Sequence, residues 1–162
     1  MMKKLFVLTL VLGLASGATA AITLANKPAE PINVGETVTI GVQNSQNGAY
    51  SGWLFVTDSS VADYENVAFT SAGDPSGAST LTEYPEYPGW IEFTVASIPP
   101  IQVAAGEHIQ VELIGAAEGT MRLEVYDTSG EVLLDSAEVT VVPEPMTIAL
   151  LGLGGLFLRR RA

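Results

Sequence analysis

Residues 106–127 read GEHIQVELIGAAEGTMRLEVYD, and their pattern predicts how the chain folds. Apolar residues occupy every second position in both halves of this stretch: Ile109, Val111 and Leu113, then Met121, Leu123 and Val125. A β-strand alternates its side chains between two faces, so each half is predicted to be a strand with one buried face. His108, Gln110 and Glu112 fall on the polar face of the first half, which predicts that they are exposed.

Alternation recurs in other parts of the chain, between clusters of turn-forming residues, at 37–42, 91–95 and 138–141. Residues 53–56, Trp-Leu-Phe-Val, are apolar on both faces and predict a central strand. No stretch between the two ends of the chain has a convincing helical period. About seven to nine strands in one domain predict an all-β fold, an antiparallel β-sandwich of jelly-roll or immunoglobulin-like topology.

The charge of the chain is strongly negative. Its 162 residues include 18 acidic and 7 basic side chains, with a formal net charge of -11. Between residues 21 and 142 the only basic residues are Lys27 and Arg122, whereas every acidic residue except Glu144 lies there. Such a surface repels phosphate backbones and suits cations or a basic partner. The chain has no cysteine, which excludes thiol catalysis, cysteine-ligated zinc and an N-terminal lipidated cysteine.

The N-terminus is typical of a secretory signal peptide. Residues 1–20 read MMKKLFVLTLVLGLASGATA, a charged start followed by an apolar run. Ala18 and Ala20 supply small residues at the two positions that signal peptidase recognises. We expect cleavage after residue 20, which leaves 21–142 as the β-sandwich domain; the alternative is a buried N-terminal helix.

Residues 143–162 form a second addressing segment, PEPMTIALLGLGGLFLRRRA. Pro143, Glu144 and Pro145 precede an apolar run over 146–158, which as a helix would span about 20 Å. A bilayer core is about 30 Å thick, so this run predicts a short, marginal transmembrane helix. The cluster formed by Arg159, Arg160 and Arg161 is expected to stay in the cytoplasm, which places the domain outside.

This three-part tail resembles the PEP-CTERM sorting signal. The resemblance implies recognition by exosortase, a membrane transpeptidase-like protein, with cleavage near the Pro-Glu-Pro triplet. It also implies export by a Gram-negative bacterium, often alongside exopolysaccharide and biofilm production. The protein would be anchored transiently in the inner membrane and then reach the cell surface, outer envelope or extracellular matrix. An ordinary C-terminal membrane anchor is the alternative, and it also leaves the domain outside the cytoplasm.

The order of motifs between the two ends resembles that of cohesin-like modules. The motifs are VGETVTIGV (34–42), YSGWLFVTDSSVADYENVAFTSAG (50–73), WIEFTVAS (90–97) and VAAGEHIQVELIGAAEGTMRLEVYD (103–127). The resemblance implies a jelly-roll sandwich on a bacterial surface, and the founding members bind dockerins through one sheet face. Thr57-Asp58 stands where the family usually has Tyr-Asp, and a generic immunoglobulin-like sandwich would give much the same pattern.

The loop EYPEYPGW at 83–90 carries the candidate binding residues Tyr84, Tyr87 and Trp90. Prolines stiffen this loop, and its rings could stack on sugars or anchor a protein partner. The alternative is a proline-rich crossover whose rings cap the open end of the core.

Candidate catalytic and metal sites are weaker. His108 is the only histidine, and no Ser-His-Asp arrangement surrounds it. Asp58, Asp63 and Glu65 lie around a turn and could hold calcium through oxygen ligands, although the spacing fits no EF-hand loop. Paired carboxylates of a glycosidase would have to face each other across a cleft, which the sequence does not show. No other cofactor is expected.

These patterns predict a non-enzymatic, exported protein that associates with a protein or a polysaccharide. Its expected partners are signal peptidase, an exosortase-type enzyme, and an exopolysaccharide or a dockerin-like protein. The alternative is a carbohydrate-binding module that uses the 84–90 loop, and a small secreted hydrolase is the third hypothesis.

Overall fold

A computed structural model describes residues 22–144 of the chain. The predicted signal peptide and the part of the tail from Pro145 onward lie outside these residues. Pro143 and Glu144 are described, as irregular chain after the last strand. Between Ile22 and Glu144, no helix has the length and apolar character needed to cross a bilayer.

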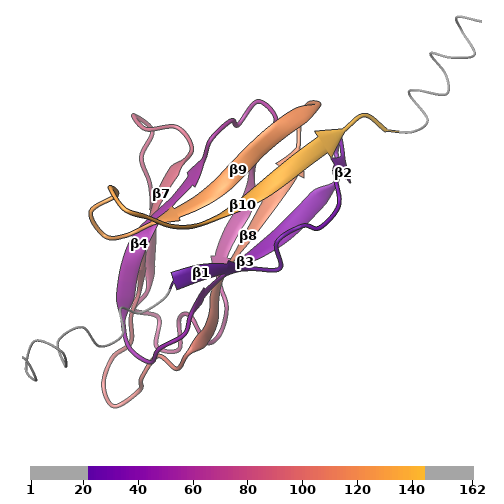
Figure 1. Cartoon of the computed structure of the whole chain (residues 1–162). Helices are drawn as coiled ribbons and strands as arrows, with labels where there is room; N and C mark the ends of the chain where they lie inside the picture. Colours follow the sequence, from indigo (N-terminus) through magenta and orange to yellow (C-terminus); the bar gives the residue numbers. More distant parts are fainter. Residues whose placement is uncertain (1–21, 145–162) are drawn as a thin grey trace, which may run out of the picture.

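Ten strands of the described chain form a two-layer sandwich (Figure 1). They are β1 (Ile22–Ala25), β2 (Ile32–Asn33), β3 (Thr37–Asn44), β4 (Tyr50–Val56), β5 (Ala62–Phe69), β6 (Thr80–Glu83), β7 (Trp90–Val95), β8 (Gly106–Gly115), β9 (Gly119–Tyr126) and β10 (Leu133–Val142). One sheet has the order β1-β3-β8-β5 and the other the order β2-β10-β9-β4-β7-β6. All neighbours are antiparallel except β2 and β10.

The all-β prediction is therefore confirmed, and the strand number slightly exceeds the expected seven to nine. The two-residue β2 and the four-residue β1 and β6 are too short to show an alternating pattern in the sequence. The prediction of a central strand at 53–56 is also confirmed, because β4 lies between β9 and β7. Leu54 and Val56 are buried between the sheets, whereas Trp53 and Phe55 point to the outer face and are half-buried.

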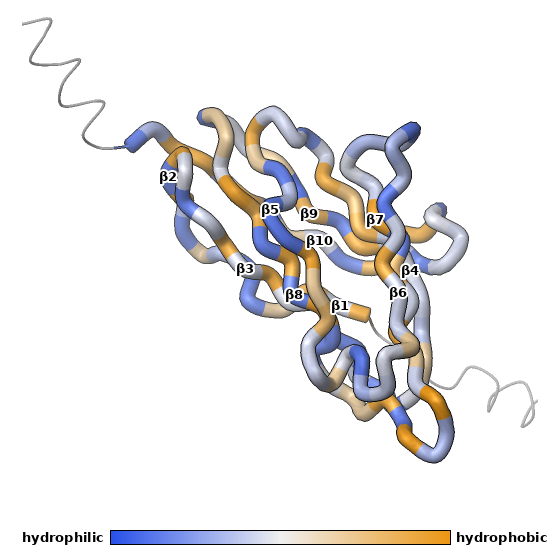
Figure 2. Tube along the Cα trace, turned by 180° about the vertical axis from the view of Figure 1, so that it is seen from behind, coloured by the Kyte–Doolittle hydropathy of each residue, from blue (hydrophilic) through white to orange (hydrophobic). Residues whose placement is uncertain are grey.

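A single apolar core lies between the two sheets. Its largest fully buried side chains are Phe93, Ile40, Leu54, Ile109, Leu113, Met121 and Leu123. Figure 2 shows how these hydrophobic stretches run along the strands and give way to hydrophilic residues between them. Burial of each such side chain contributes about 1.5–3 kcal/mol, and this burial, rather than disulfides, holds the sheets together.

The prediction that His108 is exposed is wrong, because its side chain is fully buried. A β-bulge causes the error: Val42 pairs with Ile109, whereas the next residue of β3, Gln43, pairs with Glu107. His108 is the extra residue, so two consecutive side chains of β8 turn inward. Its Nε2 donates to the carbonyl oxygen of Ala104 at 2.7 Å, which leaves Nδ1 to accept from the Tyr50 hydroxyl at 2.9 Å.

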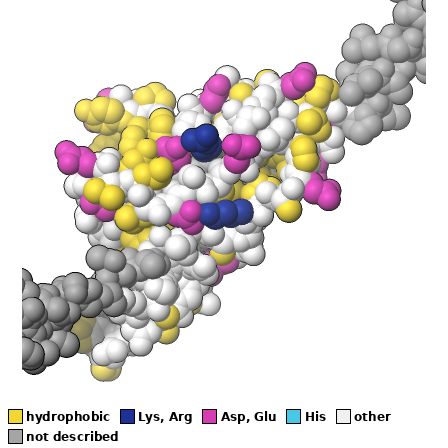
Figure 3. Space-filling view, in the orientation of Figure 1, with side chains coloured by type: hydrophobic (Ala, Val, Ile, Leu, Met, Phe, Trp, Pro, Cys, Tyr) yellow, Lys and Arg dark blue, Asp and Glu magenta, His cyan; other side chains and the backbone are white. Residues whose placement is uncertain are grey.

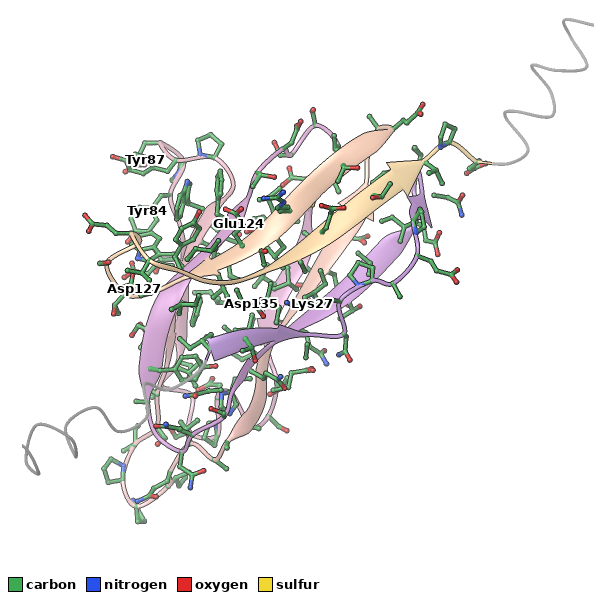
Figure 4. All side chains as sticks on the ribbon, viewed as in Figure 1. Lys27, Tyr84, Tyr87, Glu124, Asp127 and Asp135 are labelled. Atoms are coloured by element: carbon green, nitrogen blue, oxygen red, sulfur yellow. The ribbon has the colours of Figure 1, made fainter. Side chains whose placement is uncertain are left out.

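A second polar contact joins the two sheets at the chain's first and last strands. The Asp135 carboxylate of β10 accepts a hydrogen bond from the Leu24 backbone N–H of β1 at 2.8 Å. The same carboxylate binds Nζ of Lys27 at 2.6 Å, and Figure 4 shows the two side chains together. Partial burial raises the pKa of Asp135, but the hydrogen bonds from Lys27 and Leu24 outweigh burial and hold that pKa below its ordinary value.

Replacing either partner of the Tyr50–His108 pair should lower the free energy of unfolding by about 1–3 kcal/mol, because a buried polar atom loses its partner. Tyr50→Phe leaves Nδ1 of His108 unpaired, and His108→Leu leaves the Tyr50 hydroxyl unpaired. The double variant should lose less than the sum of the single losses. Urea unfolding of the four chains at neutral pH measures these values; strictly additive losses would show that the two groups do not interact.

Candidate functional site

Strand register gathers aromatic side chains on the outer face of the six-stranded sheet. Residues directly opposite each other in an antiparallel pair share a face. Trp53 of β4 lies opposite Tyr126 of β9 on one side and Glu92 of β7 on the other. Phe55, two residues further along β4, lies opposite Trp90. These rings, with Tyr84 from the adjoining loop, make up the aromatic face: Trp53, Phe55, Tyr84, Trp90 and Tyr126.

The rings of the aromatic face contact one another closely. Trp90 stacks on Phe55 with centroids 4.5 Å apart and an interplanar angle of 22°. It also meets Tyr126 at 5.3 Å and Trp53 edge-on at 6.1 Å. Trp53 in turn contacts Tyr84 at 5.5 Å. Each such pair contributes about 0.5–1.5 kcal/mol beyond the area it buries, so the contacts between the rings hold the face in shape.

No further strand or helix among residues 22–144 covers this face. Figure 3 shows its hydrophobic atoms at the left of the molecule, where Figure 1 draws β4 and β7, with acidic side chains around them. A shallow hollow of about 200 Å³ opens there, between the 84–90 loop and the β9–β10 connection. We call it the aromatic hollow, and it is lined by Trp53, Tyr87, Trp90, Ser129 and Gly130.

The 84–90 loop is held in place by its own backbone. The Tyr87 N–H donates to the Tyr84 carbonyl at 2.9 Å, and the Trp90 N–H donates to the Tyr87 carbonyl at 3.1 Å. Gly89 adopts a φ of 83°, and a Cβ there would lie 3.0 Å from the carbonyl oxygen of Val56. A glycine at this position therefore lets the loop rest against the end of β4.

Two glutamates bind the hydroxyl groups of the aromatic face. The Tyr84 hydroxyl donates to Oε2 of Glu92 at 2.5 Å, and the Tyr126 hydroxyl donates to Oε2 of Glu124 at 2.7 Å. Each hydrogen bond to a carboxylate stabilises the protonated phenol and raises the pKa of its tyrosine above the ordinary value. Figure 4 labels Tyr84 and Glu124, one residue from each of these two pairs.

The three candidate residues of the loop have different positions. Tyr84 and Trp90 belong to the aromatic face, whereas Tyr87 is 60% exposed at the edge of the aromatic hollow. The alternative in which these rings cap the open end of the core is wrong, because the rings stack outside the six-stranded sheet and none belongs to the core. Trp53, Phe55 and Tyr126 are site residues that the sequence did not predict, although residues 53–56 are apolar on both faces.

The structure does not bring the calcium candidates together. Asp58 accepts hydrogen bonds from the backbone and side chain of Ser60 in its own turn, and Glu65 accepts one from the Thr37 hydroxyl. Asp63 accepts one from the Tyr64 backbone N–H. In the part of the chain that the structure describes, no group of three His, Asp or Glu side chains could hold a metal ion.

Comparison with known proteins shows the fold. No protein-family model matches the chain, and no curated protein matches it. Several solved structures do, at low identity. The seventh ScaB type I cohesin from Pseudobacteroides cellulosolvens is 14% identical, with a TM-score of 0.53 over 75% of this chain and 91% of that chain. A type I cohesin–dockerin complex from Clostridium thermocellum is 12% identical, with a TM-score of 0.55 over 77% of this chain and 100% of that chain.

A non-cellulosomal cohesin from the archaeon Archaeoglobus fulgidus is 14% identical, with a TM-score of 0.52 over 82% of this chain and 97% of that chain. The described domain is therefore a cohesin-like β-sandwich, as the order of its motifs indicated. At these identities the likeness concerns the fold alone.

The Tyr84–Glu92 bond can be tested by titration. Tyr84 should lose its proton at a higher pH than an ordinary tyrosine, and Glu92→Gln should lower that pKa towards the ordinary value because the negative charge is gone. The bond should stabilise the fold below the ordinary pKa and cease to do so as the pH rises through the raised one. Ultraviolet difference spectra, with Tyr84→Phe to assign the signal and Glu138→Gln as the control, measure the shift. An unchanged titration in Glu92→Gln would contradict the assignment.

Proposed function

We propose that this protein is a non-catalytic docking module whose aromatic face binds a protein partner. The observation that carries the proposal is the ring cluster on the outer face of the six-stranded sheet, contributed by β4, β7, β9 and the 84–90 loop. No other element of residues 22–144 covers this face. Tryptophan and tyrosine are enriched among residues that dominate binding energy in protein interfaces. The stacked rings are already ordered, so these side chains would lose little conformational entropy when a partner binds.

The arrangement of the rings favours a protein partner over a sugar. A sugar ring stacks on an open aromatic face, whereas Trp90 has Phe55 stacked on it and further rings at its edge. The hydroxyl groups of Tyr84 and Tyr126 already donate to glutamates. A carbohydrate-binding module remains the second candidate, because Tyr87 and Trp90 line an open hollow. A hydrolase is disfavoured, because the one histidine is buried in a structural contact with Tyr50.

The solved neighbours suggest which class of partner to test. They include complexes of cohesins with dockerins, from Clostridium thermocellum and Acetivibrio cellulolyticus. A dockerin-like protein is therefore the first partner to test.

The proposed function includes export. A signal peptide at 1–20 would deliver the domain across the inner membrane, and the PEP-CTERM-like tail would hold it there for an exosortase-type enzyme. The sequence of the two ends supports this proposal. The domain would then act on the cell surface or in an exopolysaccharide matrix.

Docking is tested by selecting displayed peptides and dockerin domains on the full chain. Binders should lose at least tenfold in affinity on Trp90→Ala, since truncating a central aromatic residue of an interface commonly costs about 2 kcal/mol or more. Thr39→Ala, on the exposed face of the other sheet, should leave the affinity unchanged. Glycan-array binding that Trp90→Ala abolishes would instead support the carbohydrate-binding alternative, and binders indifferent to Trp90→Ala would exclude this face.

Export is tested by the mass of the native product. Mass spectrometry of the protein recovered from the cell envelope or medium should show an N-terminus at Ala21 and loss of the segment that follows the Pro-Glu-Pro triplet. Replacing Arg159, Arg160 and Arg161 with glutamine should leave the tail uncleaved. A product that keeps residues 1–20 and stays in the cytosol would contradict the proposal.

A further inference from the structure

A second hollow lies on the other side of the 84–90 loop. It opens where β5, the edge strand of one sheet, faces β6, the edge strand of the other. Its volume is about 440 Å³. We call it the acidic groove, and its lining is Asp63, Tyr64, Glu83, Tyr84, Pro85, Pro88, Gly89 and Ile91.

The carboxylates of the acidic groove have no basic side chain beside them among residues 22–144. The two basic residues of that segment are engaged elsewhere, Lys27 with Asp135 and Arg122 with Glu138. Asp63 and Glu83 are both exposed at the rim, and their charges act on the groove itself. Burial raises the pKa of the Tyr64 hydroxyl, and both carboxylates raise it further, which places their negative charge close to that hydroxyl.

The walls between these charges suit the stem of a long basic side chain. Tyr84, the two prolines and Ile91 offer apolar surface, and the Tyr64 hydroxyl donates to the Gly89 carbonyl at 3.2 Å. Lysine and arginine bury their methylene stems against such surface while their charged ends stay with acids or water. An arginine could also lie against the Tyr84 ring.

Tyr84 connects the groove to the aromatic face. Its ring contacts Trp53 on one side of the loop and lines the acidic groove on the other. A partner seated on the aromatic face therefore lies next to an unneutralised negative groove.

We propose that the partner of the aromatic face carries a lysine or arginine side chain that enters the acidic groove while an apolar side chain fills the aromatic hollow. This inference rests on the proposed docking function. A basic side chain is the expected occupant of the acidic groove because its charge is complementary to that of Asp63 and Glu83. The 84–90 loop separates the two hollows, so the partner contacts both sides of it. Recognition then requires one cationic and one apolar anchor in the same segment.

The first experiment tests the groove with small probes. Amide shifts of the full chain, labelled with ¹⁵N, are followed during titration with n-propylguanidinium and with its neutral analogue n-propylurea. The guanidinium should shift the amides of Asp63, Glu83 and Gly89 saturably, and the urea should not. Asp63→Asn/Glu83→Gln should weaken guanidinium binding at least fivefold. The control Glu30→Gln/Glu118→Gln, which removes the same charge from exposed positions, should not. Equal responses to the two probes would overturn the proposal.

The second experiment separates this inference from the docking proposal. Peptide selection on the wild-type chain should enrich lysine or arginine, and selection on Asp63→Asn/Glu83→Gln should lose that enrichment while keeping dependence on Trp90. Binders that need Trp90 but carry no basic residue would overturn the cationic anchor and leave docking intact. An absence of Trp90-dependent binders would overturn docking, while the guanidinium titration still reports on the groove. Urea unfolding of each variant confirms that it is folded.

Discussion

The register of β4 between β9 and β7 is the constraint on which both the core and the site depend. Leu54 and Val56 are buried in the core, and this requires Trp53 and Phe55 to face outward. A slip of one residue would bury the two rings and expose the aliphatic side chains. The hydrophobic energy that fixes the strand therefore also fixes the composition of the outer face. Stability and the proposed docking surface depend on one alignment, so the rings keep their places although no layer formed by residues 22–144 covers them.

Much of the sandwich could be predicted because alternation is a local property. Alternation predicted the strands at 37–42, 91–95, 108–113 and 121–126. The apolar character of both faces of 53–56 predicted its central position in a sheet. The aromatic face was only partly predictable, because it joins residues that are distant in the sequence, and only the loop rings were singled out. His108 was wrongly predicted to be exposed because a bulge adds one residue to β8. The alternation of apolar and polar residues in the sequence does not reveal this extra residue.

The charged residues of the described domain are unevenly distributed. Its two basic residues lie in contacts with β10, Lys27 with Asp135 and Arg122 with Glu138. The acidic residues near the 84–90 loop have two different roles. Glu92 and Glu124 accept hydrogen bonds from tyrosine hydroxyls, whereas Asp63 and Glu83 line an open groove. Carboxylates thus hold the rings of the aromatic face in place and also make the neighbouring groove negatively charged. Screening by salt should act on the second role more than on the first, since exposed charges are screened most.

The last strand also determines at which end of the sandwich the described chain ends. β10 begins at Leu133, opposite Tyr126, and ends at Val142, opposite Asn33, about 30 Å away by the rise of an extended chain. The chain leaves the sandwich at that far end (Figure 1). Any tether attached beyond Glu144 would therefore act as a stalk at the base of the sheet. The ring cluster would stand at the distal tip, turned to the medium and accessible to large partners.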